Sequence, residues 1–128
     1  MVTSQPLIMV VDDEPDLRVM VERYLSVWKF DTEGYSDPVK ALDAFRAGPS
    51  RYSLILTDVR MPYMSGIEFA NEILKVKPDM KIVLMTAFDV TDGMLSGLST
   101  IVHSEILRKP FRLAQICDSV KKKLQIAY

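Results

Sequence analysis

The sequence predicts an α/β domain in which a mostly parallel sheet of about five strands lies between two layers of about five helices, a doubly wound three-layer fold. Two features of the chain support this prediction. Short apolar runs, which are typical of strands buried on both faces of a sheet, alternate with segments whose apolar residues recur at helical spacing. These runs lead into polar or charged residues, and open α/β sheets bind their ligands at that end of the strands.

Composition limits the classes of protein that remain. The chain has 128 residues, of which 48% are hydrophobic and 26% charged, as in a single globular domain. With 16 basic and 17 acidic residues the net charge is −1, so bulk charge indicates neither a nucleic-acid nor a membrane partner. One cysteine excludes an internal disulfide, and no signal-peptide pattern or long apolar run is present. We therefore expect one cytoplasmic domain over residues 1–128.

The first half of the chain is predicted to form two strand–helix units. Residues 7–11 are the first apolar run, and a proline then suits the first turn of a helix over 15–28. Residues 30–35 alternate poorly and carry two acids, which predicts a short strand near an edge of the sheet. Asp37, followed by proline, is a predicted N-cap of the second helix, and the Gly-Pro pair at 48–49 ends that helix.

The second half continues the alternation. Strands are predicted at 52–57, 81–85 and 105–108, and helices at 67–77 and 113–124. Cys117 falls near the inner side of the last helix and is interpreted as a small core residue.

The segment over 89–100 has the weakest pattern. Gly93 and Gly97 each cost about 1 kcal/mol relative to alanine inside a helix, so a helix here would be short or poorly anchored. His103 is interpreted as a loop residue and not as a phosphate carrier.

Polar side chains that could act together follow four of the predicted strands. The carboxyl ends of parallel strands share one edge of the sheet, so we expect these groups to converge. Carboxylates brought together repel each other, and a hard divalent cation such as Mg²⁺ relieves the repulsion. A lysine and a hydroxyl beside them suit a bound anion, so the set describes an aspartyl-phosphate site. The residues are Asp12, Asp13, Asp58, Thr86 and Lys109.

Each of these residues also has a simpler interpretation. A single aspartate after a strand is more often a turn or helix cap, by roughly three to one. Asp12 and Asp13 would complement the dipole of the following helix, and Lys109 would be a solvated surface lysine. Four strands ending in the groups that one reaction needs favour the site over these separate interpretations.

Four short motifs make the chain resemble the response-regulator receiver domain of two-component signalling, over essentially its whole length. They are Val11–Pro15, Thr57–Pro62, Met85–Ala87 and Lys109–Phe111, in this order and spacing. The resemblance implies a flavodoxin-like fold with strand order 2-1-3-4-5, which the residue patterns alone do not give.

The resemblance also implies a metal site. Asp13 and Asp58 would bind Mg²⁺ directly, the backbone carbonyl of Arg60 would be the third protein ligand, and Asp12 would act through water. Asp58 would be the phosphoacceptor, taking a phosphoryl group from the phosphohistidine of a histidine kinase.

Two further residues receive roles from the same resemblance. Lys109, with a cis bond to Pro110, would pair with the phosphoryl oxygens, and Thr86 would turn to bond one of them. The domain would not be an enzyme in the ordinary sense, although it would assist its own phosphorylation and dephosphorylation. Its partners would be a sensor histidine kinase or phosphotransfer protein and an output protein or effector domain, with no membrane or direct nucleic-acid contact. A homodimer is left open.

The chain departs from the family at a position whose side chain usually changes its burial when Thr86 turns toward the phosphoryl group. Receivers usually have an aromatic residue three positions before the lysine, and Ile106 stands there. A receiver-like interaction scaffold with altered or lost phosphorylation readout is therefore the alternative. A haloacid-dehalogenase type of phosphatase is disfavoured, because that class needs an Asp-x-Asp motif and the chain has adjacent Asp12 and Asp13.

Overall fold

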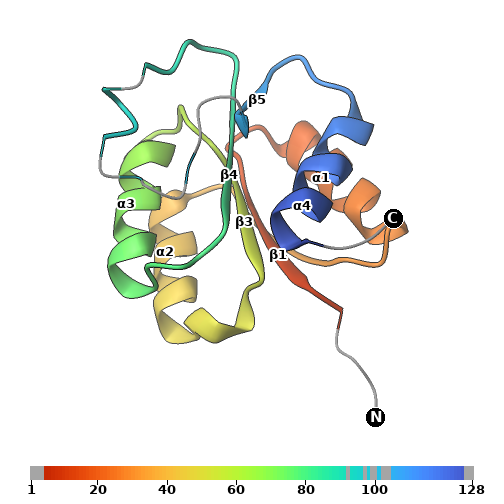
Figure 1. Ribbon diagram of the computed structural model, residues 1–128, viewed down its shortest axis with the longest axis horizontal. Helices are drawn as coiled ribbons and strands as arrows, with labels where there is room; N and C mark the ends of the chain where they lie inside the picture. The colour runs from red at the N-terminus through yellow and green to blue at the C-terminus, as the bar shows by residue number, and fades with distance from the viewer. Residues whose placement is uncertain (1–4, 92, 97, 99–100, 102–104, 126–128) are drawn as a thin grey trace.

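A parallel five-stranded sheet forms the centre of the molecule in the computed structural model, which describes residues 5–91, 93–96, 98, 101 and 105–125. The strands lie in the order β2-β1-β3-β4-β5, and Figure 1 shows the twisted sheet between its helices. The predicted fold and strand order are confirmed. The strands are β1 (Leu7–Val11), β2 (Asp31–Tyr35), β3 (Leu54–Asp58), β4 (Ile82–Thr86) and β5 (Leu107–Arg108).

Helices cover both faces of this sheet. In Figure 1, α1 and α4 lie together on one side and α2 and α3 on the other, giving three layers. A short 3-10 turn at Pro49–Arg51 follows α2. The helices are α1 (Pro15–Val27), α2 (Pro38–Ala47), α3 (Gly66–Val76) and α4 (Leu113–Leu124).

The region between β4 and β5 differs from the prediction. The described residues of 89–101 form successive turns and no helix, and Gly93 contributes the low helix propensity that the sequence indicated. The remaining residues of that segment, and His103, lie outside the described ranges. Strand β5 is also shorter than the predicted 105–108: Glu105 and Ile106 precede it.

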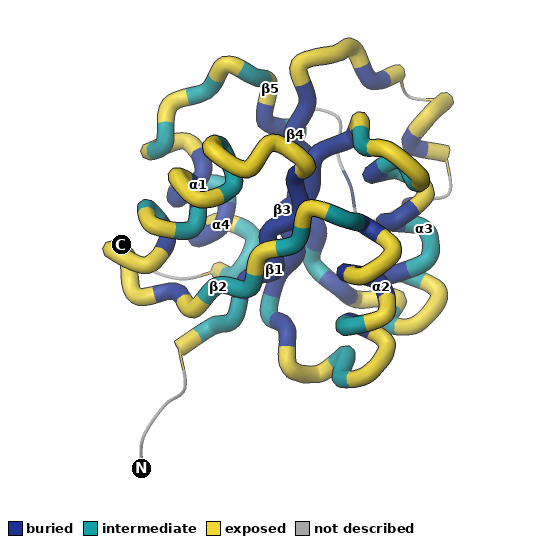
Figure 2. Tube along the Cα trace, turned by 180° about the vertical axis from the view of Figure 1, so that it is seen from behind, coloured by how far each residue is buried: buried dark blue, intermediate teal, exposed yellow. Residues whose placement is uncertain are grey.

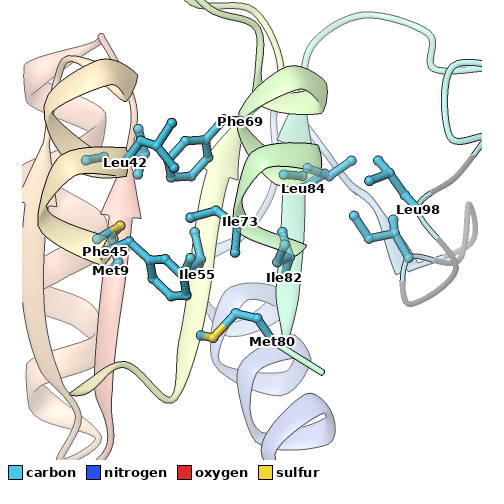
Figure 3. Close-up of a cluster of buried hydrophobic side chains, with 14 of the residues drawn as sticks. Met9, Leu42, Phe45, Ile55, Phe69, Ile73, Met80, Ile82, Leu84 and Leu98 are labelled. Carbon is cyan, nitrogen blue, oxygen red and sulfur yellow. The ribbon is translucent and has the colours of Figure 1, made fainter. Parts of the chain in front are cut away.

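The core consists of two hydrophobic clusters, one on each face of the sheet. In β3, Ile55 packs into the cluster under α2 and α3, while Leu54 and Leu56 pack into the cluster under α1 and α4. Figure 3 shows Ile55 in the first cluster together with Phe45 from α2 and Phe69 from α3. Figure 2 shows β3 in dark blue at the buried centre of the molecule. This double burial explains why β3 is a continuous apolar run rather than an alternating one.

Local signals place the helix starts. The Asp37 side chain accepts a hydrogen bond from the backbone N–H of Val39 at 2.9 Å, which confirms the predicted N-cap. Ser65 caps α3 in a reciprocal capping box with Glu68, a feature absent from the sequence predictions.

Gly66, the first residue of α3, approaches the backbone that carries Asp58. A Cβ atom added at Gly66 would collide with the Asp58 carbonyl oxygen and lie 2.8 Å from the Cα of Val59. The Gly66 N–H also donates to the Val59 carbonyl at 2.7 Å. The absence of a side chain therefore lets α3 begin directly against the end of β3.

Replacing Gly66 by alanine should lower the free energy of unfolding by about 1–3 kcal/mol, because backbone on both sides of the contact must shift. Urea denaturation measures the change. Gly93→Ala is the matched control: the nearest atom to its added Cβ is 3.8 Å away, so its stability should be unchanged or raised by up to about 1 kcal/mol. Equal effects of the two substitutions would contradict the close approach.

Candidate functional site

The predicted site residues gather at the carboxyl edge of the sheet. Asp58 is the last residue of β3, and Asp12 directly follows β1. Val11 pairs with Thr57 in the parallel register, so the two aspartates that follow lie on neighbouring strands. Thr86 ends β4 and Lys109 follows β5. The prediction that these groups converge is met for Asp12, Asp58 and Lys109.

Lys109 connects the acids of the site. Its Nζ lies 3.2 Å from Asp12 Oδ2, 3.1 Å from Glu14 Oε1 and 3.4 Å from Asp58 Oδ2. A lysine ammonium has three N–H donors, and here three carboxylates surround it. The Asp12 side chain is fully buried and that of Asp58 is 7% exposed, whereas the Glu14 side chain is 62% exposed.

Backbone hydrogen bonds fix the positions of these side chains. Asp12 Oδ1 accepts from the N–H of Glu14 at 2.9 Å, and Asp58 Oδ1 accepts from the N–H of Val59 at 2.9 Å. Lys109 donates its own N–H to the Thr86 carbonyl at 2.8 Å, and its bond to the next residue is cis, as predicted. The site is therefore held by the sheet and its first loop residues rather than by long side chains alone.

Burial and neighbouring charges change the acidity of the site. Burial, with the charge of Asp12 adding to it, raises the pKa of Asp58 to about 6, although Lys109 opposes the rise. Burial also raises the pKa of Asp12. For Lys109, burial acts to lower the pKa, but the charges of Asp12 and Asp58 outweigh it and the pKa is raised. The lysine therefore stays charged, but its single positive charge does not offset the burial of Asp12 and Asp58.

The carboxylates form a compact group of oxygen ligands. Among the described residues, oxygens of Asp12, Glu14 and Asp58 lie within 4.8 Å of one another. All-oxygen ligands suit a hard divalent cation such as Mg²⁺. Asp13, a predicted ligand, is exposed and is not part of this group; its role as a ligand stays a prediction. Glu14 was not predicted as a site residue, and its only sequence signal is its place in the acidic run after β1.

The two predicted switch residues lie at β4 and β5: Thr86 ends β4, and Ile106 directly precedes β5. Thr86 is buried, and its Oγ1 accepts a hydrogen bond from the N–H of Phe88 at 3.0 Å. The guanidinium of Arg60 stacks over the Phe88 ring, 4.2 Å from its centroid. Ile106 is half-buried and packs against the cluster under α2 and α3. Thr86 is thus bonded to its own loop and not to Ile106.

The fold and the group of acids at the carboxyl edge of the sheet agree with the protein family that the sequence matches. The sequence model of the response regulator receiver domain matches residues 8–121. The chain belongs to this family. Receiver domains of two-component response regulators are signalling domains and not enzymes of the usual kind, and the acidic group at the edge of the sheet fits Mg²⁺ binding in this family.

Individual proteins are similar to this chain over most of its length. The response regulator receiver protein CpdR of Brucella abortus is 27% identical over 117 residues, covering 91% of this chain and 95% of the relative. Sporulation initiation phosphotransferase F of Bacillus subtilis is 27% identical, covering 93% and 94%. The structure of TrrA from Thermotoga maritima, in complex with Mg(2+)-BeF, has a TM-score of 0.78 at 34% identity, covering 93% and 99%. Other curated relatives are longer, and the chain spans 27% to 52% of several of them.

Within the described residues, no helix is both long and apolar enough to span a membrane.

The raised pKa of Asp58 makes a prediction for stability against pH. The ordinary pKa of Asp58 is 3.8, and its pKa in the folded protein is about 6. Between these two pH values the folded protein therefore binds more protons than the unfolded chain. As the pH rises from about 4 to about 6, Asp58 ionises and the free energy of unfolding falls. Above the folded pKa of about 6 this loss of stability has reached its full size. In metal-free buffer, Asp58→Asn should raise the free energy of unfolding by about 1–3 kcal/mol above pH 7 and by much less near pH 4. Urea denaturation at several pH values measures this difference.

The control for this experiment is Asp43→Asn, which removes an exposed acid on α2. It should follow the wild type at all pH values. A gain for Asp58→Asn that does not depend on pH would contradict the assignment to ionisation.

Proposed function

We propose that this chain accepts a phosphoryl group on Asp58 and that the modified residue changes the surface recognised by an output partner. The observation that supports this most is the position of Asp58. It is a nearly buried carboxylate at the end of the central strand, 3.4 Å from the ammonium of Lys109. A structural cap would need neither that burial nor that cation.

In the proposed transfer, a carboxylate oxygen of Asp58 attacks the phosphorus of a phosphohistidine. The phosphorus–nitrogen bond breaks, and its electron pair stays on the imidazole. A proton on the other ring nitrogen lets the imidazole leave as a neutral group. Later attack by water on phosphorus releases inorganic phosphate and restores the carboxylate.

Mg²⁺ is the cofactor that fits this edge of the sheet. Asp13 and Asp58 would hold it directly, with the backbone carbonyl of Arg60, and Asp12 would bond one of its waters. The close group of oxygens from Asp12, Glu14 and Asp58 supports a hard cation at this edge, and the raised pKa values of Asp12 and Asp58 show that Lys109 alone does not offset their burial. When bound, Mg²⁺ neutralises charge on the phosphoryl oxygens during transfer.

Lys109 and Thr86 would respond to the phosphoryl group. Lys109 is charged and touches Asp58, so one of its N–H groups can turn to a phosphoryl oxygen. Thr86, on the neighbouring strand, would donate a hydrogen bond from its hydroxyl group to another phosphoryl oxygen. Its Oγ1 now accepts from the N–H of Phe88, so this movement would change the loop after β4.

The proposed donor is a sensor histidine kinase or a phosphotransfer protein, and the receiver of the signal is an output protein or an attached effector domain. The name of the Bacillus relative, a phosphotransferase, is consistent with such a relay. Ile106 supports the alternative of an interaction scaffold with altered or lost phosphorylation readout, because an isoleucine cannot act as the usual aromatic reporter.

Phosphorylation is tested by incubating the protein with Mg²⁺ and acetyl phosphate and measuring its intact mass. The wild type should gain the mass of one phosphoryl group, and both Asp58→Asn and removal of Mg²⁺ with a chelator should abolish the gain. Asp43→Asn should gain as the wild type does. No gain in the wild type at saturating donor would favour the scaffold.

Lys109→Ala should separate metal binding from the conformational response. Without the ammonium, the carboxylates still attract Mg²⁺, and calorimetry should show binding at least as tight as in the wild type. The amide spectrum of the variant should no longer shift on phosphorylation beyond the residues next to Asp58. Lys40→Ala, which removes an exposed lysine on α2, should behave as the wild type. An unchanged response in Lys109→Ala would refute the role given to this lysine.

A further inference from the structure

Glu14 is the member of the acidic group that has no part in the proposed function. Its side chain is 62% exposed, yet its Oε1 is 3.1 Å from Lys109 Nζ. The corresponding distances from Nζ to Asp12 and Asp58 are 3.2 and 3.4 Å. An exposed acid therefore makes a contact with the lysine as close as those made by the two buried acids.

The backbone around Glu14 directs its side chain to this contact. Glu14 is the N-cap residue of α1, but its side chain makes no capping hydrogen bond. Its N–H donates to Asp12 Oδ1 at 2.9 Å and its carbonyl accepts from the N–H of Arg18 at 3.0 Å. The main chain is thus anchored on both sides, and the carboxylate reaches across to the loop after β5.

We propose that Glu14 is a positioning residue: it holds one N–H of Lys109 in the unphosphorylated protein and releases it when Lys109 turns to the phosphoryl group. This inference rests on the proposed role of Asp58. Lys109 donates hydrogen bonds to Asp12 and Glu14, whereas its contact with Asp58 is an ion pair at 3.4 Å. To follow a phosphoryl group placed on Asp58, the ammonium therefore has to give up or weaken one of those two hydrogen bonds.

Burial decides which carboxylate is released. The Asp12 side chain has no exposed surface, so losing Lys109 would leave a buried charge unpaired, which is strongly unfavourable. The Glu14 carboxylate is mostly in solvent, and water replaces its partner at little expense. Glu14 is therefore the contact that is exchanged, and its strength sets how readily Lys109 moves.

Two substitutions separate the contact from the charge. Glu14→Gln removes the negative charge beside the site and weakens the contact with Lys109. Glu14→Asp keeps the charge but shortens the side chain by one methylene, so the carboxylate is withdrawn from Lys109. Asp16→Asn is the control, because it removes an exposed acid from the first turn of the same helix.

The contact itself is measured in the metal-free full chain, without any phosphorylation. The side-chain ammonium signal of Lys109 in ¹⁵N NMR reports its exchange with water. Both Glu14 variants should speed this exchange by at least about twofold, because the charge-assisted hydrogen bond from Lys109 to residue 14 is weakened. Asp16→Asn should not change it. Unchanged exchange in both Glu14 variants would overturn the proposal.

The positioning role is measured by phosphorylation with acetyl phosphate at saturating Mg²⁺. Both Glu14 variants should react about two- to fivefold faster, because Lys109 is released more readily. Calorimetry should show Mg²⁺ binding weakened about threefold in Glu14→Gln but within about twofold of the wild type in Glu14→Asp, since only the first variant loses charge.

The outcomes distinguish this inference from the proposed function. Wild-type rates in both variants would overturn the positioning role, and so would faster reaction of Glu14→Gln alone, which would show a charge effect without the contact. A wild-type protein that takes no phosphoryl group would overturn the proposed function and the positioning role together, while the ammonium signal would still report the contact.

Discussion

The meeting of one ammonium with three carboxylates is the interaction on which the carboxyl edge of this sheet depends. Asp12 and Asp58 lie at the carboxyl ends of adjacent strands, and the side chain of Asp12 is fully buried while that of Asp58 is nearly so. Two such charges would repel each other and favour protonation. Lys109 supplies the positive charge that allows them to remain together, and the backbone bond from Lys109 to Thr86 fixes that charge to the sheet. The same shortage of positive charge makes this edge suitable for a cation.

The burial of Asp58 follows from the position of its strand. β3 is the middle strand of five, and each face of it is covered by helices. A carboxylate at the end of such a strand cannot be fully hydrated, which is why its pKa rises to about 6. Gly66 completes this environment, because only a residue without a side chain lets α3 start against the carbonyl of Asp58. The position of Asp58 and the packing of the core are thus set by the same segment.

Much of this arrangement could be predicted from the sequence. Alternating apolar and helical segments determine the α/β fold, and four of the five strands lead into a residue of the candidate site. Features that depend on side chains crossing between loops could not be predicted in the same way. Glu14 reaches Lys109 across 95 positions of sequence, and neither residue type nor spacing indicates that contact. The turns that replace a helix before β5 were only partly indicated, because low propensity shows where a helix is weak but not what replaces it.

The position of Ile106 affects how a change at Asp58 would spread. In this chain the Thr86 hydroxyl is bonded to the N–H of Phe88, and the Phe88 ring is stacked under Arg60 from the loop after β3. A movement of Thr86 toward Asp58 would take an acceptor from Phe88 and disturb that stack. The two loops that flank the acidic group would then respond together, without an aromatic residue at position 106. An isoleucine at position 106 is therefore compatible with a conformational change that passes from Asp58 to the loops after β3 and β4.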